Sequence, residues 1–250
     1  AAQMNLQAVW VFLACAGVAE IMGTMAGFGA ATILTPIASF FLPIKVAVSV
    51  VACFHLFGNA SRLYFFGRHI VWRIVWRFGL PGIALSFAGA QVTAWLPAHQ
   101  IRLLLGGFLL MYVLLDVLGA TTLRLPARPH TLLVGGVGSG FIAGLIGTGG
   151  AIRSVCLLAF GLPKEAYLGT SAIIALMVDA TRLPVYLSQG LLPSSLWPLV
   201  LSLTLVAFGG AWIGQRVIRR ISPVWFRRVV LLMLALMGIK LLADALSGLG

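Results

Sequence analysis

The chain has 250 residues, of which 61% are hydrophobic and 9% charged, and its formal net charge is +12 at pH 7. This composition is far more apolar than that of an ordinary soluble domain and leaves too little polar surface to cover a water-soluble globule. The positive charge does not indicate nucleic-acid binding, because the basic residues fall mainly between apolar stretches and form no aromatic-interleaved groove.

Apolar segments long enough for membrane helices occupy nearly the whole chain. Crossing about 30 Å of hydrocarbon takes roughly 20 helical residues, and lipid-exposed backbone must satisfy its own hydrogen bonds. The period-two alternation of barrel strands is absent, so an all-α polytopic membrane protein is predicted. In chain order the segments lie near residues 5–23, 26–43, 44–66, 76–97, 100–119, 131–147, 149–162, 164–188, 195–217 and 224–246.

The chain repeats itself at a constant offset of 120 residues. Residues 27–63 match residues 147–183 at 11 of 37 positions, including Gly, Pro and one Arg, which shared hydrophobicity alone would not produce. The matches are Gly27/Gly147, Gly29/Gly149, Ala31/Ala151, Phe40/Phe160, Leu42/Leu162, Pro43/Pro163, Ala52/Ala172, Leu56/Leu176, Ala60/Ala180, Arg62/Arg182 and Leu63/Leu183. We expect residues 1–122 and 123–250 to be two transmembrane repeats of one integrated domain, each with five helical segments.

The basic loops predict how the repeats are oriented. The loop after the third segment is basic in the first half but uncharged in the second, and the loop after the fourth shows the reverse. The positive-inside rule therefore gives an inverted repeat with the basic loops in the cytoplasm and both termini outside it. The basic groups are Arg68, Arg73 and Arg77; Arg124 and Arg128; and Arg216, Arg219, Arg220, Arg227 and Arg228.

The second segment of each half is short and opens with glycines. The motifs are Gly27-Phe28-Gly29-Ala30-Ala31 and Gly147-Thr148-Gly149-Gly150-Ala151, and each segment runs to a Leu-Pro break. It is either a tilted full helix or half of a re-entrant hairpin. Paired glycine-interrupted segments are the best sequence pointer to a transporter's binding site, because free N–H groups at a helix start can face an anion. The alternative is that these glycines only allow close helix packing.

Arg153 lies three residues into the second of these short segments, where the first half has Ile33. An arginine within an apolar segment is costly and points to a functional site, and its planar fork suits sulfonate, phosphate or carboxylate oxygens. We therefore predict that Arg153 is the principal anion ligand. The alternative is that the side chain extends to the lipid headgroups.

The third segment of each half carries a polar pair at i, i+3 spacing, which places both members on one helix face. The pairs are Asn59 with Arg62 and Asp179 with Arg182, and His55 extends the first by one turn. They are either structural or line a solute pathway, and Thr170 and Ser171 offer hydroxyls near the same helix. Proton coupling is predicted to involve Glu20, His55 or Asp179, although a neutral or hydrogen-bonded interior carboxyl is the alternative for Glu20.

These motifs resemble the sulfite exporter TauE/SafE family over nearly the whole chain. The resemblance is strongest in Gly147-Thr148-Gly149-Gly150 and in the run from Gly161 to Ser171; the first half departs from it with Gly29-Ala30 and Ser49-Val50-Val51. It implies a multi-pass inner-membrane permease for sulfite, organosulfonates or related organic anions. The expected partners are therefore a small anionic solute and the lipid bilayer, with no nucleic acid; proton or ion coupling and a homodimer stay open.

Two other classes of function are alternatives to transport. An intramembrane hydrolase would need Ser139 with His55, or Asp116 with Asp179, and the sequence does not place either pair in contact. A structural membrane protein that transports nothing is the other alternative. No metal or cofactor is expected, because Cys15, Cys53 and Cys156 lie singly in apolar segments without metal-ligand spacing.

Overall fold

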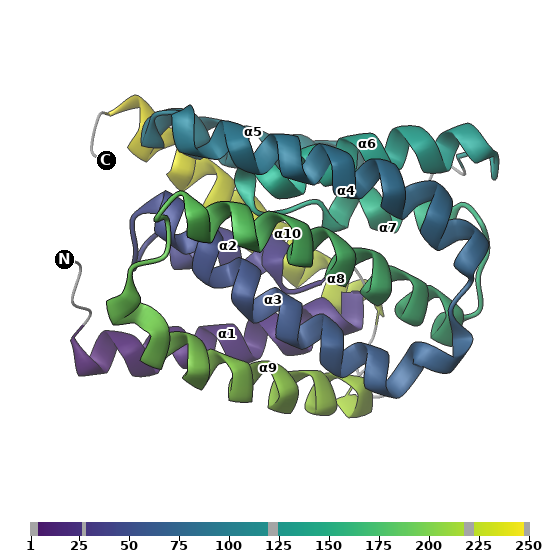
Figure 1. Ribbon diagram of the computed structural model, residues 1–250, viewed down its shortest axis with the longest axis horizontal. Coiled ribbons are helices and arrows are strands. Elements are labelled where there is room, and N and C mark those ends of the chain that lie inside the picture. The colour runs from purple at the N-terminus through teal and green to yellow at the C-terminus, as the bar shows by residue number, and fades with distance from the viewer. Residues whose placement is uncertain (1–4, 27–28, 120–124, 218–222, 248–250) are drawn as a thin grey trace.

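The computed structural model describes residues 5–26, 29–119, 125–217 and 223–247, and these form ten α-helices, two short 3-10 helices and no strands (Figure 1). The predicted all-α fold is confirmed, while the predicted boundary between the halves, at 122/123, lies outside the described residues. The helices are α1 (Leu6–Ala26), α2 (Ala31–Ala38), α3 (Ile44–Phe66), α4 (Trp72–Trp95), α5 (Ala98–Val117), α6 (Pro129–Ile146), α7 (Gly150–Leu158), α8 (Lys164–Ser188), α9 (Trp197–Val217) and α10 (Pro223–Leu246), with 3-10 turns at Gly67–His69 and Ser194–Leu196.

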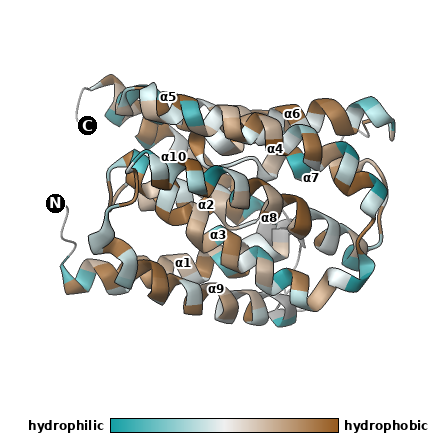
Figure 2. Ribbon diagram, viewed as in Figure 1, coloured by the Kyte–Doolittle hydropathy of each residue, from teal (hydrophilic) through white to brown (hydrophobic). Residues whose placement is uncertain are grey.

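Seven of the described helices are long and apolar enough to cross a membrane. The helix α4, with 24 residues, is equally long and packs along α6 and α8. Hydrophobic residues follow the lengths of the helices in Figure 2, and many large apolar side chains are exposed on the outside of the bundle. A soluble protein would not tolerate this exposure, so the chain is a multi-pass membrane protein.

The short helices α2 and α7 resolve the alternative left open by the sequence. They contain 8 and 9 residues. At 1.5 Å per residue each covers only about 12–14 Å, less than half of the roughly 30 Å hydrocarbon layer. Neither is a full crossing. Pro43 and Pro163 precede the first residues of α3 and α8, so each short helix ends before the Leu-Pro break and a new helix begins after it.

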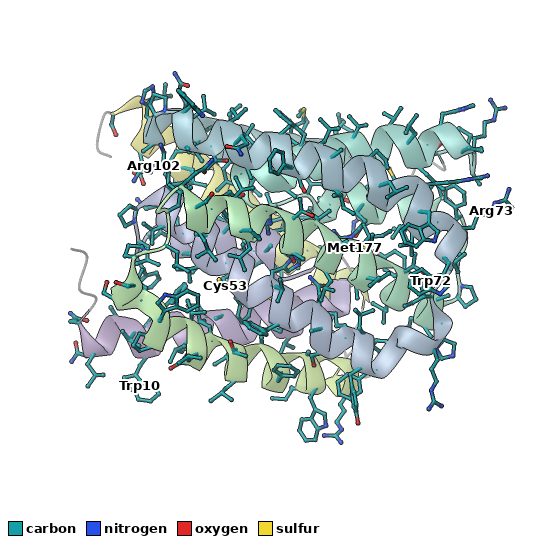
Figure 3. All side chains as sticks on the ribbon, viewed as in Figure 1. Trp10, Cys53, Trp72, Arg73, Arg102 and Met177 are labelled. Carbon is teal, nitrogen blue, oxygen red and sulfur yellow. The ribbon has the colours of Figure 1, made fainter. Side chains whose placement is uncertain are left out.

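Helix α1 begins and helix α10 ends at the same end of the bundle, as Figure 1 shows. The described parts of the basic groups lie at the opposite end, where α4, α6 and α10 begin. Figure 3 shows Arg73 at this end and Arg102 at the other. Arg124, Arg219 and Arg220 lie outside the described residues.

The first helix of each half packs against the fourth helix of the other half. The pairs are α1 with α9 and α6 with α4. In both pairs the neighbours run in parallel: a Cβ on Gly140 or Gly144 of α6 would meet the carbonyl oxygens of Gly82 or Ser86 of α4 at 2.2 Å. On α9, Gly210 and Gly214 in turn contact α1 residues. Small residues let these membrane helices approach at backbone contact.

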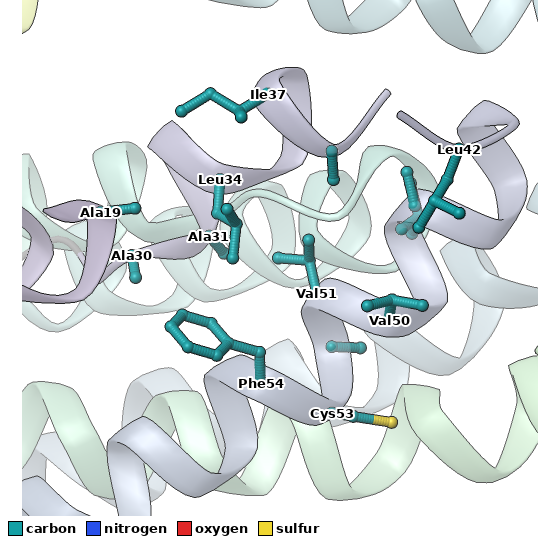
Figure 4. Close-up of a cluster of buried hydrophobic side chains, with 14 of the residues drawn as sticks. Ala19, Ala30, Ala31, Leu34, Ile37, Leu42, Val50, Val51, Cys53 and Phe54 are labelled. Carbon is teal, nitrogen blue, oxygen red and sulfur yellow. The ribbon is translucent and has the colours of Figure 1, made fainter. Parts of the chain in front are cut away.

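The third helices, α3 and α8, pack against each other at the centre, and each short helix packs against the third helix of its own half. All eight residues of α2 are buried. Figure 4 shows Leu34 of α2 in the same cluster of buried apolar side chains as Val51 and Phe54 of α3. The polar residues of α3 and α8 are therefore held inside a packed helical core.

Candidate functional site

The first half of the central site is built around Arg62 on α3. Its NH2 group is paired with Glu20 of α1, its Nε donates to Thr24 Oγ1 at 3.1 Å, and its NH1 donates to Asn59 Oδ1 at 2.9 Å. All four side chains are buried. The predicted Asn59–Arg62 pair is confirmed as a contact, and Glu20 is an ion-pair partner that sequence spacing did not identify.

The second half is built around Arg182 on α8 in a corresponding way. Its NH2 lies 2.8 Å from Asp179 Oδ1, which confirms the predicted i, i+3 pair. Its NH1 donates to the backbone carbonyl of Ala143 on α6, and the Tyr186 hydroxyl donates to the carbonyl of Gly144. Each arginine thus holds the first helix of its own half, through side chains in one case and through backbone carbonyls in the other.

His55 and Asn59 of α3 join the two halves through Asp179 of α8. The His55 Nδ1 donates to Asp179 Oδ2 at 2.7 Å, and the Asn59 amide donates to the same oxygen at 3.2 Å. A carboxylate can only accept hydrogen bonds, so this network assigns the proton of a neutral His55 ring to Nδ1. A continuous polar chain therefore runs from Glu20 on α1 to Arg182 on α8 through the middle of the bundle.

The starts of the two short helices meet near this chain. Thr148, just before α7, donates its hydroxyl to Thr32 in the first turn of α2 at 2.7 Å. Gly147 ends α6 with a φ of +82°, and Gly29 precedes α2 with a φ of +88°, conformations that favour glycine. Gly27 and Phe28 lie outside the described residues.

Gly149 and Gly150 have close packing around them. A Cβ on Gly149 would lie 2.1 Å from the carbonyl oxygen of Ser139 on α6, and the Ser139 hydroxyl donates to the Gly149 carbonyl at 2.8 Å. Gly150 is the buried first residue of α7. At Gly149 this geometry directly supports the interpretation that the glycine motif allows close helix packing. Gly29, by contrast, faces a polar side chain: a Cβ added there would lie 2.3 Å from Nε2 of His55.

Arg153 is buried within α7, with 3% of its surface exposed. Its Nε donates to Ser171 Oγ on α8 at 3.0 Å, and it is close enough to Asp179 and His55 to interact with them electrostatically. A side chain extended to the lipid headgroups would be exposed, so this alternative is wrong for the conformation described. The contact also brings the predicted residue Ser171 into the site.

Thr170 has a different role from Ser171. Its hydroxyl accepts a hydrogen bond from the backbone N–H of Val71 at 3.0 Å, where the chain enters α4. Its position is therefore at the junction between two helices, at the end of the bundle where α4 begins.

The central site carries excess positive charge. Of the five acidic residues in the chain, Glu20 and Asp179 lie in the polar chain. The other three lie near helix ends: Asp116 pairs with Arg227 at 2.8 Å, Asp244 pairs with Lys240, and Glu165 is exposed in the first turn of α8. Three buried arginines, Arg62, Arg153 and Arg182, face those two carboxylates. With His55 neutral, three positive and two negative charges leave one positive charge, which an anion can balance.

The residue pairs considered for hydrolysis have other partners. Ser139 is bonded to Gly149, whereas His55 is bonded to Asp179. Asp116 is bonded to Arg227, and Asp179 lies in the central chain. Neither combination forms the joined nucleophile and base, or the shared carboxylate pair, that such chemistry requires.

Sequence reasoning missed Thr24, Thr32 and Tyr186 as members of the site. Thr24 follows Glu20 by four residues, so helical spacing could have indicated that both lie on one face of the same helix. Tyr186 likewise follows Arg182 by four residues. Thr32 carries no such signal, because its partner Thr148 is 116 residues away.

An apolar cavity of about 280 Å³ lies between α5 and α7. Phe108 and Met111 of α5 line one side, and Ile152 and Val155 of α7 line the other. Arg153 is not part of the lining. Among the described residues no charged side chain lines the cavity, and none of its lining residues belongs to the polar chain.

Comparison with known protein families identifies one that covers most of the chain. The family model described as sulfite exporter TauE/SafE matches residues 12–241. No curated protein matches the chain.

Proposed function

Since the chain belongs to the sulfite exporter TauE/SafE family, a family of membrane transporters, we propose that it is an inner-membrane permease for small anions. Sulfur-containing anions such as sulfite and organosulfonates are its first candidate solutes. The solute occupies the region between the starts of α2 and α7, next to Arg153.

The observation that carries this proposal is the burial of Arg153 on a helix too short to cross the membrane. Removing an arginine from water inside a membrane protein is costly and is repaid only by partners or by function. Its guanidinium adds a positive charge to a site where two arginines already have carboxylate partners. An oxyanion with two oxygens accessible to the fork restores the charge balance.

The remaining predicted ligands support the same site in different ways. Thr148 and Gly147 shape the turn before α7, and Ser171 holds Arg153. Asn59, Arg62, Asp179 and Arg182 connect the halves, so solute binding at the centre is transmitted to α1 and α6. We assign Gly149 to the packing of α7 on α6 rather than to direct solute contact.

The proposed orientation places both termini outside the cytoplasm and the arginine-rich end inside. This is supported by the arrangement of the helices: α1 begins and α10 ends at one end of the bundle (Figure 1), and Arg73 of the positive-inside pattern lies at the other (Figure 3). The two halves then have opposite orientation, and alternating access is a movement of one half against the other around the polar chain.

Uptake by purified protein in liposomes tests the function. Labelled sulfite, sulfoacetate and methanesulfonate are offered separately, and an Arg153→Ala protein serves as the matched negative control. Saturable uptake of one of these anions, lost in the variant, is the expected result. The same background uptake as protein-free liposomes for all three would reject the proposed function and leave a structural role.

A further inference from the structure

His55 differs from the other histidines of the chain in its environment. It is 4% exposed, whereas His69, His99 and His130 are all exposed. Its Nδ1 is fixed by Asp179 Oδ2, which leaves Nε2 as the atom that can gain or lose a proton.

The Nε2 atom is buried and has no hydrogen-bond partner among the described residues. It points at Gly29, where a built Cβ would lie only 2.3 Å away, so the turn before α2 packs directly on the imidazole edge. Protonating Nε2 in this arrangement would give a positively charged ring whose Nε2–H group has no hydrogen-bond acceptor. Burying such a group costs far more than burying the neutral ring, so this conformation accommodates the neutral form.

Charged neighbours act on His55 from several elements. On its own helix, Arg62 is neutralised by Glu20 of α1; on α8, Asp179 is shared with Arg182; and α7 contributes Arg153. Of the other helices that pack on α3, α2 contains no charged residue, and the one charged residue of α9, Arg216, lies in its last turn over the Trp212 ring. The ionisable side chains of Cys53 on α3 and Tyr186 on α8 lie near Asp179 and Arg182. Asp179 thus favours a charged imidazole, whereas Arg153 opposes it.

We propose, on the basis of the transport function above, that His55 carries a proton together with the anion and that the Gly29 turn controls access to Nε2. When the turn lies on the ring, His55 is neutral. When the turn moves away, Nε2 accepts a proton from water, and the positive charge of the imidazolium is balanced by Asp179 and by the bound anion. The proton returns to water from the same atom after the site opens to the other side, and the Nδ1–H bond to Asp179 is kept throughout.

The two acids of the polar chain fit this role less well than His55 does. Asp179 accepts bonds from Arg182, His55 and Asn59, and protonating it would leave Arg182 without its counter-charge. One carboxylate oxygen of Glu20 pairs with Arg62 and accepts a hydrogen bond from Thr24. Protonating Glu20 would likewise leave Arg62 without its counter-charge. His55 alone gains a proton without breaking an arginine pair.

The test measures proton and anion movement together in proteoliposomes that contain a pH-sensitive dye. Sulfoacetate is the probe, because both its acidic groups are ionised at neutral pH and the solute brings no proton of its own. For the unmodified protein, an inward sulfoacetate gradient should acidify the interior. Uptake of sulfoacetate without acidification would overturn the inference, while the proposed function would stand.

The variant His55→Gln separates coupling from folding. The glutamine amide can still donate to Asp179 but cannot titrate, so acidification should fall to the level of protein-free liposomes. Exchange of labelled for unlabelled sulfoacetate in the same liposomes shows that the variant is folded and binds the anion. The exposed His130→Gln is the matched control and should acidify like the unmodified protein. Acidification per sulfoacetate that is equal in His55→Gln and the unmodified protein would also overturn the inference.

Discussion

Asn59 and Asp179, which stand at the same position in the two halves of the chain, are hydrogen-bonded to each other, with the Asn59 amide donating to Asp179 Oδ2 at 3.2 Å. They lie where α3 and α8 pack against each other at the centre of the bundle. The two arginines three residues later then turn away to opposite sides, Arg62 to α1 and Arg182 to α6. Any movement of one half against the other must therefore act on this contact.

Arg153 should determine solute affinity. Hydrogen bonds to charged groups contribute about 1.5–3 kcal/mol, so Arg153→Ala should weaken anion binding about 10- to 150-fold. Arg153→Lys should also bind worse, because a lysine keeps the charge but cannot make a bidentate contact. Calorimetric titration of the purified protein with sulfite and sulfoacetate measures both. The exposed Arg73→Lys is the control, and wild-type affinity in Arg153→Ala would contradict the assignment.

The Glu20–Arg62 pair should be a stability determinant. Removing one partner of a buried pair costs about 3–5 kcal/mol, because the other charge is left uncompensated. Glu20→Gln and Arg62→Met should each lower the thermal unfolding midpoint in detergent. The double variant should lose less than the two single losses together. Additive losses would show that the two side chains are not coupled.

Packing of α6 on α4 should depend on the absence of side chains at the glycines. In Gly140→Ala the new methyl group would lie 2.2 Å from a backbone oxygen of Gly82, which a side-chain movement cannot relieve. We expect a loss of about 1–3 kcal/mol of stability. Gly107 is the matched control, because a Cβ there meets nothing within 4 Å. Gly107→Ala should be neutral or stabilising by up to about 1 kcal/mol. Equal midpoints for the two variants would contradict the close packing.

The proposed orientation can be read by cysteine labelling in a protein in which Cys15, Cys53 and Cys156 have been replaced. The exposed Ser194 lies in the turn before α9, at the end of the bundle where α1 begins. A cysteine at Ser194 should react with an impermeant reagent added to intact cells. A cysteine at the exposed His69 should react only after the membrane is permeabilised. The opposite pattern would reverse the orientation.

Local sequence patterns predicted most of the helices and the pairs within them. The spacing of Asn59 from Arg62 and of Asp179 from Arg182 placed each pair on one face, and both contacts are present. Such predictions succeed because helical geometry fixes the neighbours at i+3 and i+4. The contacts between His55 and Asp179 and between Thr32 and Thr148 span more than a hundred residues. They depend on how helices cross, which periodicity does not encode.

The sequence repeat did not predict a difference in backbone conformation between the two glycine motifs. Gly29 and Gly149 are equivalent by sequence, yet the φ angle is +88° at Gly29 and −129° at Gly149. The reason is that α7 begins at Gly150, one residue earlier than the equivalent start of α2 at Ala31. Gly149 therefore packs on α6, whereas Gly29 packs on His55. The shared glycine motif predicted two similar turns, but α2 and α7 begin at non-equivalent residues, and the two turns therefore contact different parts of the protein.

The contact between Asn59 and Asp179 also limits how the two halves can have diverged. Two copies of the second half would place one aspartate against another, and the repulsion between two adjacent carboxylates would oppose the packing of α3 on α8. Two copies of the first half would leave each histidine facing an asparagine and remove the acceptor that orients its ring. The two halves therefore differ at two positions that set the arginine partners: Asn59 stands opposite Asp179, and Glu20 stands where the second half has Gly140. Each arginine then has a single carboxylate partner, Glu20 for Arg62 and Asp179 for Arg182. A molecule rebuilt from identical halves would keep one carboxylate for each arginine but would lose the unlike Asn59–Asp179 pair that joins α3 to α8.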